Sequence, residues 1–397
     1  MREMKDSGVE GIDLVPENWD RVQLEHCAYI IRGGSPRPIE QYMSETDEGY
    51  SWIKIGDTEK GNKYITHIRE KIISAGLSKT RYVKAGTLLL TNSMSFGEPY
   101  ILKVNGCIHD GWLAFSNLKF VDKEFLYYFL VSPACRVQFE KSSDGGVVQN
   151  LNIDKVKHSI VYFPSVSEQQ AIVAFLDSKC AEIDALSADI QSEIETLEAY
   201  KRSVITEAVT KGMDKNVPMK ESGIEWVGEI PATWDVHPVY AYFEERKNKN
   251  YALQEQNLLS LSYGKIIRKD IDTLGGLLPA SFNTYNIVEA GDIIIRPTDL
   301  QNDKRSLRTG LVTEKGIITS AYIDLAPRGN INSEYFHYLL HSYDVQKVFY
   351  NMGNGVRQGL NYSEFSKLMV FTPSRDEQNA IVSYLNAKCA EIEAIIN

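Results

Sequence analysis

Two stretches of the chain decide the fold: PSVSEQQAIVAFLDSKCAEIDAL at 164–186 and PSRDEQNAIVSYLNAKCAEIEAI at 373–395. They align without a gap at an offset of 209, and fourteen of the 23 positions are identical. A match of this length marks an internal repeat, in which one structural unit is built twice. The chain therefore carries two copies of a helix-forming segment, and a separate region precedes each copy.

The repeat extends upstream of both stretches. Three further pairs of segments match in the same order: 4–20 with 219–235, 85–93 with 290–298, and 146–164 with 355–373. We therefore predict two modules that alternate with two helices: a first module at 1–165, a first long helix and linker at 166–217, a second module at 218–373, and a second helix at 374–397. The module centres, at 30–80 and 240–285, share little. This favours two modules with different targets on one scaffold, and drift of surface loops is the alternative.

The first helix has the pattern of a coiled coil. Ser167 is the predicted N-cap, with Gln170 at capping-box spacing, and Gly212 ends the run. Apolar residues recur every seven positions or fill the positions between, which predicts a buried seam: Leu176, Ile183, Leu186, Ile190, Leu197, Tyr200 and Val204. At 1.5 Å per residue, the rod is about 65–70 Å long.

The second helix starts in the same way, with Asp376 as the predicted N-cap. Its expected seam residues are Ile381, Leu385 and Ile392. The chain stops at Asn397, whereas a full copy of the first helix would run to about residue 420 by the offset of the repeat. Antiparallel pairing would then leave the start of the first helix without a partner. We expect another polypeptide, or further tail residues, to cover it.

Each module combines strands with helices. Segments rich in β-branched and aromatic residues predict strands: 52–57, 81–92, 100–115, 292–298 and 316–326. Apolar residues at helical spacing predict helices at 123–132 and 334–350. The predicted fold class is α+β: two α/β modules with twisted mixed sheets, and two long helices that pack as an antiparallel coiled coil.

The charge of the chain is unevenly distributed. Net charge is −10, and the helical segments 166–217 and 374–397 carry −7 of it, so the modules are nearly neutral and hold local basic clusters. No run of eighteen apolar residues or secretory segment is present, and the five cysteines form no CxxC pair. Trp19 and Trp234 are expected as core anchors, and Cys180 and Cys389 as buried packing residues.

Motifs for catalysis are missing from the sequence. It contains no NPPY or DPPY loop of an amino-methyltransferase, no GxGxxG, no phosphate-binding GxxxxGK[ST] and no HExxH. The seven histidines do not cluster with cysteines at metal-ligand spacing. We therefore predict no catalytic residue, no metal and no bound cofactor in this chain.

The Pro-x-x-Trp turn of each module and the FPSxxEQxAIVxFLDxK run of the long helix resemble the specificity subunit of type I restriction–modification systems. The resemblance implies that each module is a target-recognition domain for half of a split DNA site, and that the helices hold the domains apart. It also implies two modification subunits, which use S-adenosylmethionine to methylate adenine, and restriction subunits with an ATP-driven, magnesium-dependent motor. The cysteine usage fits a reducing cytosol, so we expect a cytoplasmic location.

Basic and amide side chains are the expected DNA contacts, because Lys and Arg bind phosphates and Arg, Asn and Gln read base edges. In the first module they are Lys54, Lys60, Lys63, Arg69, Lys71, Arg81, Asn92, Ser93 and Ser95. In the second they are Arg296, Gln301, Asn302, Lys304, Arg305 and Arg308. The second rank comprises 246–250, Lys265, Arg268 and Lys269.

Three alternatives remain on the sequence alone. A helix-linked scaffold that binds only proteins would fit the acidic composition. A sequence-nonspecific duplex binder is disfavoured by the unlike module centres. A nuclease is disfavoured because no cluster of carboxylates with a lysine is evident.

Overall fold

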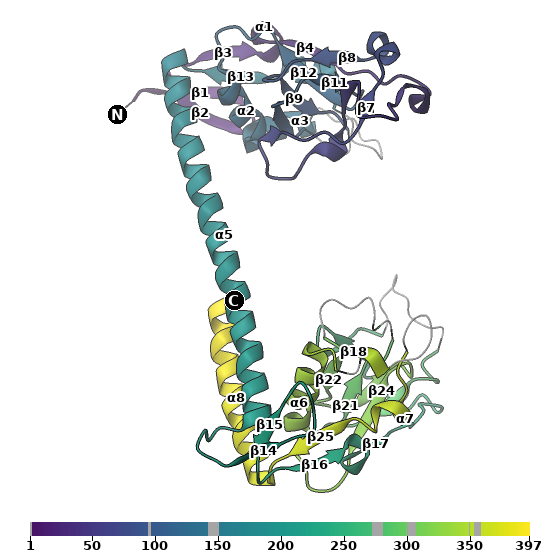
Figure 1. Cartoon of the computed structure of the whole chain (residues 1–397). Helices are drawn as coiled ribbons and strands as arrows, with labels where there is room; N and C mark the ends of the chain where they lie inside the picture. The colour runs from purple at the N-terminus through teal and green to yellow at the C-terminus, as the bar shows by residue number, and fades with distance from the viewer. Residues whose placement is uncertain are drawn as a thin grey trace. The chain divides into compact units, whose positions relative to one another are not determined.

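The computed structural model describes residues 2–93, 97–141, 151–271, 281–298, 300, 307–348, 350–352 and 359–397. The chain forms two compact units, Met1–Leu186 and Ser187–Asn397. Helix α5, Val166–Lys211, contributes its first part to the first unit and its remainder to the second (Figure 1).

The first unit contains two mixed sheets. The larger has the order β4-β12-β9-β10-β6: Tyr29–Arg32, Trp112–Ser116, Leu88–Thr91, Pro99–Leu102 and Tyr64–Ile65. The smaller has the order β7-β5-β11-β8: Lys71–Ile72, Tyr50–Ile53, Gly106–Ile108 and Arg81–Val83. Each sheet has one parallel pair, β10 with β6 and β11 with β5. The mixed sheet predicted for this module is confirmed.

The described residues of the first unit also form two short ribbons and the helices α1 to α4. The ribbons pair β1 with β2 and β3 with β13: Met4–Val9, Ile12–Pro16, Asp20–Gln23 and Ile160–Phe163. The helices α1 to α4 are Leu24–Cys27, Lys123–Val131, Pro133–Lys141 and Ile153–His158. The core is built around β9, whose four residues are all buried. Leu88 and Leu90 pack with α2, and Leu89 packs on the opposite face with Trp112.

The second unit repeats this central arrangement. Its main sheet has the order β17-β24-β21-β22: Phe243–Glu245, Ile323–Pro327, Ile293–Ile295 and Thr309–Leu311. Leu113 faces Leu90 across β12 and β9, and Ile323 faces Ile295 across β24 and β21. The segments 85–93 and 290–298, which match in the sequence, therefore form corresponding buried strands in the two units.

Four strand pairs and three helices surround this sheet. β14 (Met219–Glu221) pairs with β15 (Glu229–Pro231), and β16 (Asp235–Pro238) pairs with β25 (Met369–Thr372). β18 (Leu259–Ser262) pairs with β19 (Lys265–Arg268), and β20 (Asn286–Val288) pairs with β23 (Gly316–Ile318). The helices α6, α7 and α8 are Ser333–Val345, Tyr362–Phe365 and Arg375–Ile396. The helix predicted at 334–350 therefore ends a turn early, at Val345, and the predicted strand 100–115 divides into β10, β11 and β12.

Within the second unit, α8 lies antiparallel along the end of α5 (Figure 1). Lys201 of α5 forms an ion pair with Glu393, near the end of α8, whereas Gly212 lies beside Glu377 at its start. The predicted seam residues Val204, Ile381, Leu385 and Ile392 are all buried there. The antiparallel helix pair is confirmed for this part of the rod.

The seam is uncovered at the start of α5, as expected from antiparallel pairing with a short second helix, but the prediction that Leu186, Ile190 and Tyr200 lie in the core of the helix pair is wrong. Ile183, Leu186 and Ile190 are 61%, 59% and 49% exposed, and Tyr200 is 53% exposed. Leu176 and Leu197 are half-buried. The reason is geometric, since α8 runs beside only the last turns of α5. For the same reason Cys389 is buried, as predicted, whereas its counterpart Cys180 is exposed, which corrects the expectation for that thiol.

Both long helices begin at a serine that directly follows a proline. Ser165 Oγ accepts a hydrogen bond from the Glu168 N–H at 3.4 Å, and Ser374 Oγ accepts one from the Glu377 N–H at 3.3 Å. The predicted caps, Ser167 and Asp376, are therefore wrong by two residues. Each strand before the helix ends at or just before the proline, so the next residue takes the N-cap position.

A buried glutamine joins each helix start to its module. Gln169 Nε2 donates to the carbonyls of Phe120 and Pro164 at 3.0 and 2.9 Å, and its Oε1 accepts from the Asp122 N–H at 2.6 Å. Gln169 has no exposed surface. Asp122 is itself the N-cap of α2, so one side chain connects the starts of two helices.

The second unit repeats this joint. Gln378 Nε2 donates to the Pro373 carbonyl at 2.9 Å, and its Oε1 accepts from the Asn332 N–H at 2.8 Å. Asn332 is the N-cap of α6, the counterpart of α2. The module tryptophans complete both joints, because Trp19 and Trp234 donate to Glu168 and Glu377 at 3.4 and 3.1 Å. Trp234 is fully buried, as expected of a core anchor, whereas Trp19 is half-buried.

We predict that Gln169→Ala destabilises the first unit by about 1–3 kcal/mol, because a buried N–H and two carbonyls lose their partners. The apparent Tm of that unit should fall by several degrees in differential scanning calorimetry. Gln170→Ala is the matched control, since Gln170 is the exposed neighbour on the same turn. Equal melting of the two variants would contradict a stabilising joint.

A buried carboxyl lies in the main sheet of the second unit. Asp324 of β24 is 1% exposed, and neither of its oxygens has a hydrogen-bond partner in the described part of the chain. Burial raises the pKa of Asp324 to about 8, and the charge of Asp292 adds to the rise while Arg246 opposes it. The side chain is therefore protonated in the folded chain near neutral pH.

We predict that Asp324 makes the second unit less stable as the pH rises. An unfolded aspartate loses its proton near pH 3.9, so between about pH 4 and the folded pKa of about 8 the folded state binds more protons. The free energy of unfolding therefore falls across that window. Asp324→Asn should melt higher than the wild type at pH 8.5 and more nearly equal to it at pH 4.5. Asp189→Asn, at an exposed position of α5, is the control.

Candidate nucleic-acid interface

The first unit has an open cleft of about 700 Å³ beside its smaller sheet. The segment between β4 and β5 forms one wall, and β5 with the turn between β11 and β12 forms the other. Seven polar or charged residues and five apolar ones line it: Ser35, Pro36, Arg37, Pro38, Ile39, Glu40, Met43, Trp52, Lys54, Glu70, His109 and Asp110.

Close backbone packing fixes the two walls against each other. The N–H groups of Gly33 and Gly34 donate to the carbonyls of Trp112 and Ile108 at 2.9 and 3.1 Å. A Cβ on Gly33 would stand 2.0 Å from the His109 carbonyl oxygen, which no side chain could tolerate. Glycine is therefore required at this position, because the segment passes directly over the turn that carries His109 and Asp110.

Asp110 is the centre of a polar network at the mouth of the cleft. Its carboxylate accepts a hydrogen bond from the Ser35 hydroxyl at 2.8 Å and lies 3.5 Å from the Arg37 guanidinium. Its carbonyl accepts from Arg32 Nε at 2.8 Å and from Asn92 Nδ2 at 3.1 Å. Burial acts to raise the pKa of Asp110, but Ser35, His109 and Arg32 outweigh it, so the pKa lies below its usual value.

His109 is held in one orientation beside this carboxylate. Burial lowers the pKa of the imidazole, which is therefore neutral near pH 7. Its Nδ1 accepts a hydrogen bond from the Gly111 N–H at 2.6 Å, so the ring proton resides on Nε2. The cleft thus combines a carboxylate, a hydroxyl and an imidazole that hydrogen bonds hold in place with the exposed guanidinium of Arg37.

The predicted DNA contacts of the first module differ in their surroundings: some form ion pairs, some are buried and some are exposed. Lys54 lines the cleft and forms an ion pair with Glu70, and Lys71 pairs with Asp47. Asn92 is buried beneath Asp110, and Ser93 is half-buried. Three cations are exposed: Lys60, Arg69 and Arg81. Ser95 lies outside the described residues.

Lys63 is a correction, because it joins α5 to the module instead of facing solvent. Its side chain is 14% exposed, and Nζ lies 2.7 Å from Glu124 and 2.8 Å from Asp177 of α5. The Tyr128 hydroxyl donates to the same Asp177 carboxylate at 2.6 Å. The sequence could not distinguish this lysine from Lys60, since both fall in one basic cluster.

Arg308 is the corresponding correction in the second unit. It is 4% exposed, its N–H donates to Asp344 at 2.6 Å, and its guanidinium donates to the carbonyls of Arg296 and Thr298. It therefore stabilises the two ends of the predicted contact segment and is not available to a ligand. Arg296 is exposed. Gln301, Asn302, Lys304 and Arg305 lie outside the described residues.

The second-rank cations of this unit are also divided. Arg246 forms an ion pair with the buried Asp292 at 2.8 Å, and Arg268 pairs with Glu314. Lys265 and Lys269, on the β18–β19 hairpin and directly after it, are exposed. The cations presented to solvent in this unit therefore include Lys265, Lys269 and Arg296.

Sequence reasoning missed Ser35, Arg37, His109 and Asp110. The available signals were GGSPRP at 33–38 and the short turn HDG at 109–111, where glycine and proline mark special backbone geometry. Neither is a basic cluster, and only the sheet brings the two segments together.

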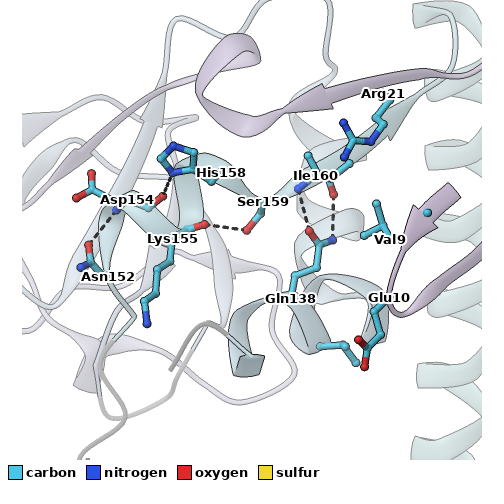
Figure 2. A pocket seen from close by; sticks show the side chains of 12 residues that line it. Val9, Glu10, Arg21, Gln138, Asn152, Asp154, Lys155, His158, Ser159 and Ile160 are labelled. Carbon is cyan, nitrogen blue, oxygen red and sulfur yellow. Dashed lines mark hydrogen bonds between the residues drawn. The ribbon is translucent and has the colours of Figure 1, made fainter. Parts of the chain in front are cut away.

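A second cavity, of about 690 Å³, lies between β1, β13 and helices α3 and α4. Figure 2 shows that Gln138 is directed at the backbone of Ile160, with which it makes two hydrogen bonds of 3.0 and 2.8 Å. His158 likewise contacts the Asp154 carbonyl. The lining mixes Arg21 and Lys155 with Glu10 and Asp154. These hydrogen bonds stabilise the packing of the module. Because basic and acidic side chains both line the cavity, it does not present a single sign of charge to a ligand.

No group of three or more His, Cys, Asp or Glu side chains among the described residues could hold a metal ion. In the same part of the chain, no helix combines the length and apolar character needed to cross a bilayer.

Comparison with known proteins shows what this chain resembles. Residues 16–196 match the type I restriction modification DNA specificity domain. Over this range the chain is similar to the specificity subunits of type I restriction–modification systems. A putative type I restriction enzyme specificity subunit of Methanocaldococcus jannaschii, MjaX, is 24% identical over 95% of this chain and 88% of its own length. The MjaVIII specificity subunit of that organism is 24% identical over 71% of this chain and 64% of its own length.

Solved structures agree on the fold. A chain reported for complex assembly and conformational transition of the type I restriction–modification system matches with a TM-score of 0.70 and 13% identity, over 96% of this chain and 93% of that one. The HsdS subunit of Thermoanaerobacter tengcongensis matches with a TM-score of 0.54 and 14% identity, over 96% and 91%. The predicted fold class of two α/β domains with long helices is confirmed.

We predict that Lys63→Met destabilises the first unit by about 1–3 kcal/mol, because Glu124 and Asp177 lose the cation between them. Lys60→Met is the matched control at an exposed position of the same cluster. Urea unfolding followed by circular dichroism should separate the two variants. Equal midpoints would mean that Lys63 does not stabilise the attachment of α5.

Proposed function

We propose that this chain is the subunit that reads DNA in a type I restriction–modification complex, with one half of a split site bound by each unit. The observation that supports this most directly is the duplication itself. The joints around Gln169 and Gln378 are repeated, whereas the turn with His109 and Asp110 corresponds to Thr319 and Ser320 in the second unit. A repeated scaffold with different exposed side chains suits two different half-sites.

Exposed cations among the predicted contacts supply the contact to phosphates in this proposal. In the first unit these include Lys60, Arg69 and Arg81, and in the second Lys265, Lys269 and Arg296. Such contacts position a protein on the duplex without reading sequence, and they make the affinity salt-dependent. The net charge of −10 does not oppose this, because much of the negative charge lies on the long helices.

The proposal includes protein partners that carry the chemistry. Two modification subunits would provide S-adenosylmethionine and the adenine methyltransferase site, and restriction subunits would provide the ATP-dependent motor. This chain would bind no cofactor itself. The exposed residues Ile183, Leu186 and Ile190 form an apolar stripe on α5 that a partner polypeptide would cover.

We predict that the chain, expressed with its modification subunits, directs adenine methylation at a bipartite motif with a fixed gap. Long-read sequencing of host DNA that detects N6-methyladenine gives the motif directly. The purified chain alone should transfer no methyl group from S-adenosylmethionine. A continuous motif, or no motif, would contradict the proposal.

A binding experiment then separates DNA reading from the alternative of a scaffold for proteins only. The triple variant Lys60→Ala, Arg69→Ala and Arg81→Ala should bind the identified duplex more weakly, with the slope of log affinity against log salt reduced by up to about three. Fluorescence anisotropy across a salt series measures both quantities. Lys179→Ala with Lys388→Ala is the control, since both lysines lie on the long helices and pair with a neighbouring glutamate.

A further inference from the structure

We propose that Arg37 and Asp110 together read one G·C base pair in the half-site bound by the first unit. This inference rests on the proposed function and names the residues and the chemical target of one of its reading elements. It arises from the cleft network and uses no residue of the predicted basic clusters.

The geometry presents donors and an acceptor side by side. An Arg37 guanidinium nitrogen lies 3.5 Å from an Asp110 carboxylate oxygen, and the two side chains are 82% and 42% exposed. Both therefore keep polar edges open to solvent while they remain adjacent. The spacing between them is close to that of neighbouring polar groups on a base-pair edge.

The pattern of these groups matches G·C. In the major groove, guanine presents two acceptors, N7 and O6, and the paired cytosine presents the N4 amino donor next to them. The Arg37 fork supplies two donors for guanine, and the Asp110 carboxylate accepts from cytosine N4. An A·T pair alternates acceptor, donor and acceptor, so the second guanidinium donor would face the adenine N6 donor and the carboxylate would face the thymine O4 acceptor.

The carboxylate is positioned before DNA binds. Ser35 donates to it, and Arg32 and Asn92 hold the carbonyl of the same residue. The close passage of Gly33 over the His109 carbonyl fixes the turn from the other side. A reading group that is held in this way does not lose entropy on binding and discriminates more sharply between base pairs.

The internal repeat provides an independent argument. The shared register of the central strands places Ser320 of the second unit at the position of Asp110. A serine cannot provide an ionised acceptor, so the two units differ at this point of an otherwise repeated framework. Residues that distinguish two half-sites are expected where the backbone is the same and the side chains differ.

The test maps methylated motifs for complexes that contain Arg37→Gln or Asp110→Asn, each expressed with the modification subunits. We expect both variants to lose the preference for G·C at one shared position of one half-site, by roughly tenfold to a hundredfold. The other half-site and the gap should stay unchanged. Asp110→Asn keeps an oxygen for the Ser35 hydroxyl, and Arg37 is a surface side chain, so both variants should melt with the wild type.

Arg69→Gln is the matched control, an exposed arginine of the same unit that does not line the cleft. It should weaken binding without changing the motif. An unchanged G·C preference in both cleft variants overturns the inference, as does a wild-type motif with no G·C pair in either half-site. Failure of the proposed function gives a different result, because the wild-type complex would then show no split motif.

Discussion

The structure depends on one interaction that occurs twice, the buried glutamine at the start of each long helix. Gln169 and Gln378 satisfy backbone groups at the exit of a strand and at the start of a module helix. Each one therefore ties the direction of a long helix to the core of its module. A buried amide of this kind is costly if any partner is missing, so it favours a single arrangement of the helix on the module.

This constraint separates the parts of the chain that hold the fold from the parts that are free to differ. The glutamine of the joint and the capping serine are identical in both copies, and the central strands are apolar in both. The cleft in the first unit is built on the same strands, but its side chains come from the turn at 109–111 and the segment at 33–43. Changes there leave the joint intact, so the side chains of the cleft can differ while the helix attachment is retained.

Electrostatics follow the same division. The long helices carry most of the excess negative charge, whereas the modules are nearly neutral and expose local cations such as Lys60 and Arg69. Several basic residues are instead neutralised inside the protein, among them Lys63 by two carboxylates and Arg246 by Asp292. The surface presented to a polyanion is therefore smaller than the count of basic residues indicates.

The sequence by itself determined the duplication, the order of modules and helices, the central strands and the seam at Val204, because these depend on local periodicity and on repeats. It could not separate Lys63 from Lys60, or identify Arg308 as buried, because burial depends on contacts between distant segments. Only the tertiary structure brought Arg37 beside Asp110, since their separation in sequence carries no local signal. It also decided where the seam is covered, because the length of helix that packs against α5 is a property of the folded pair.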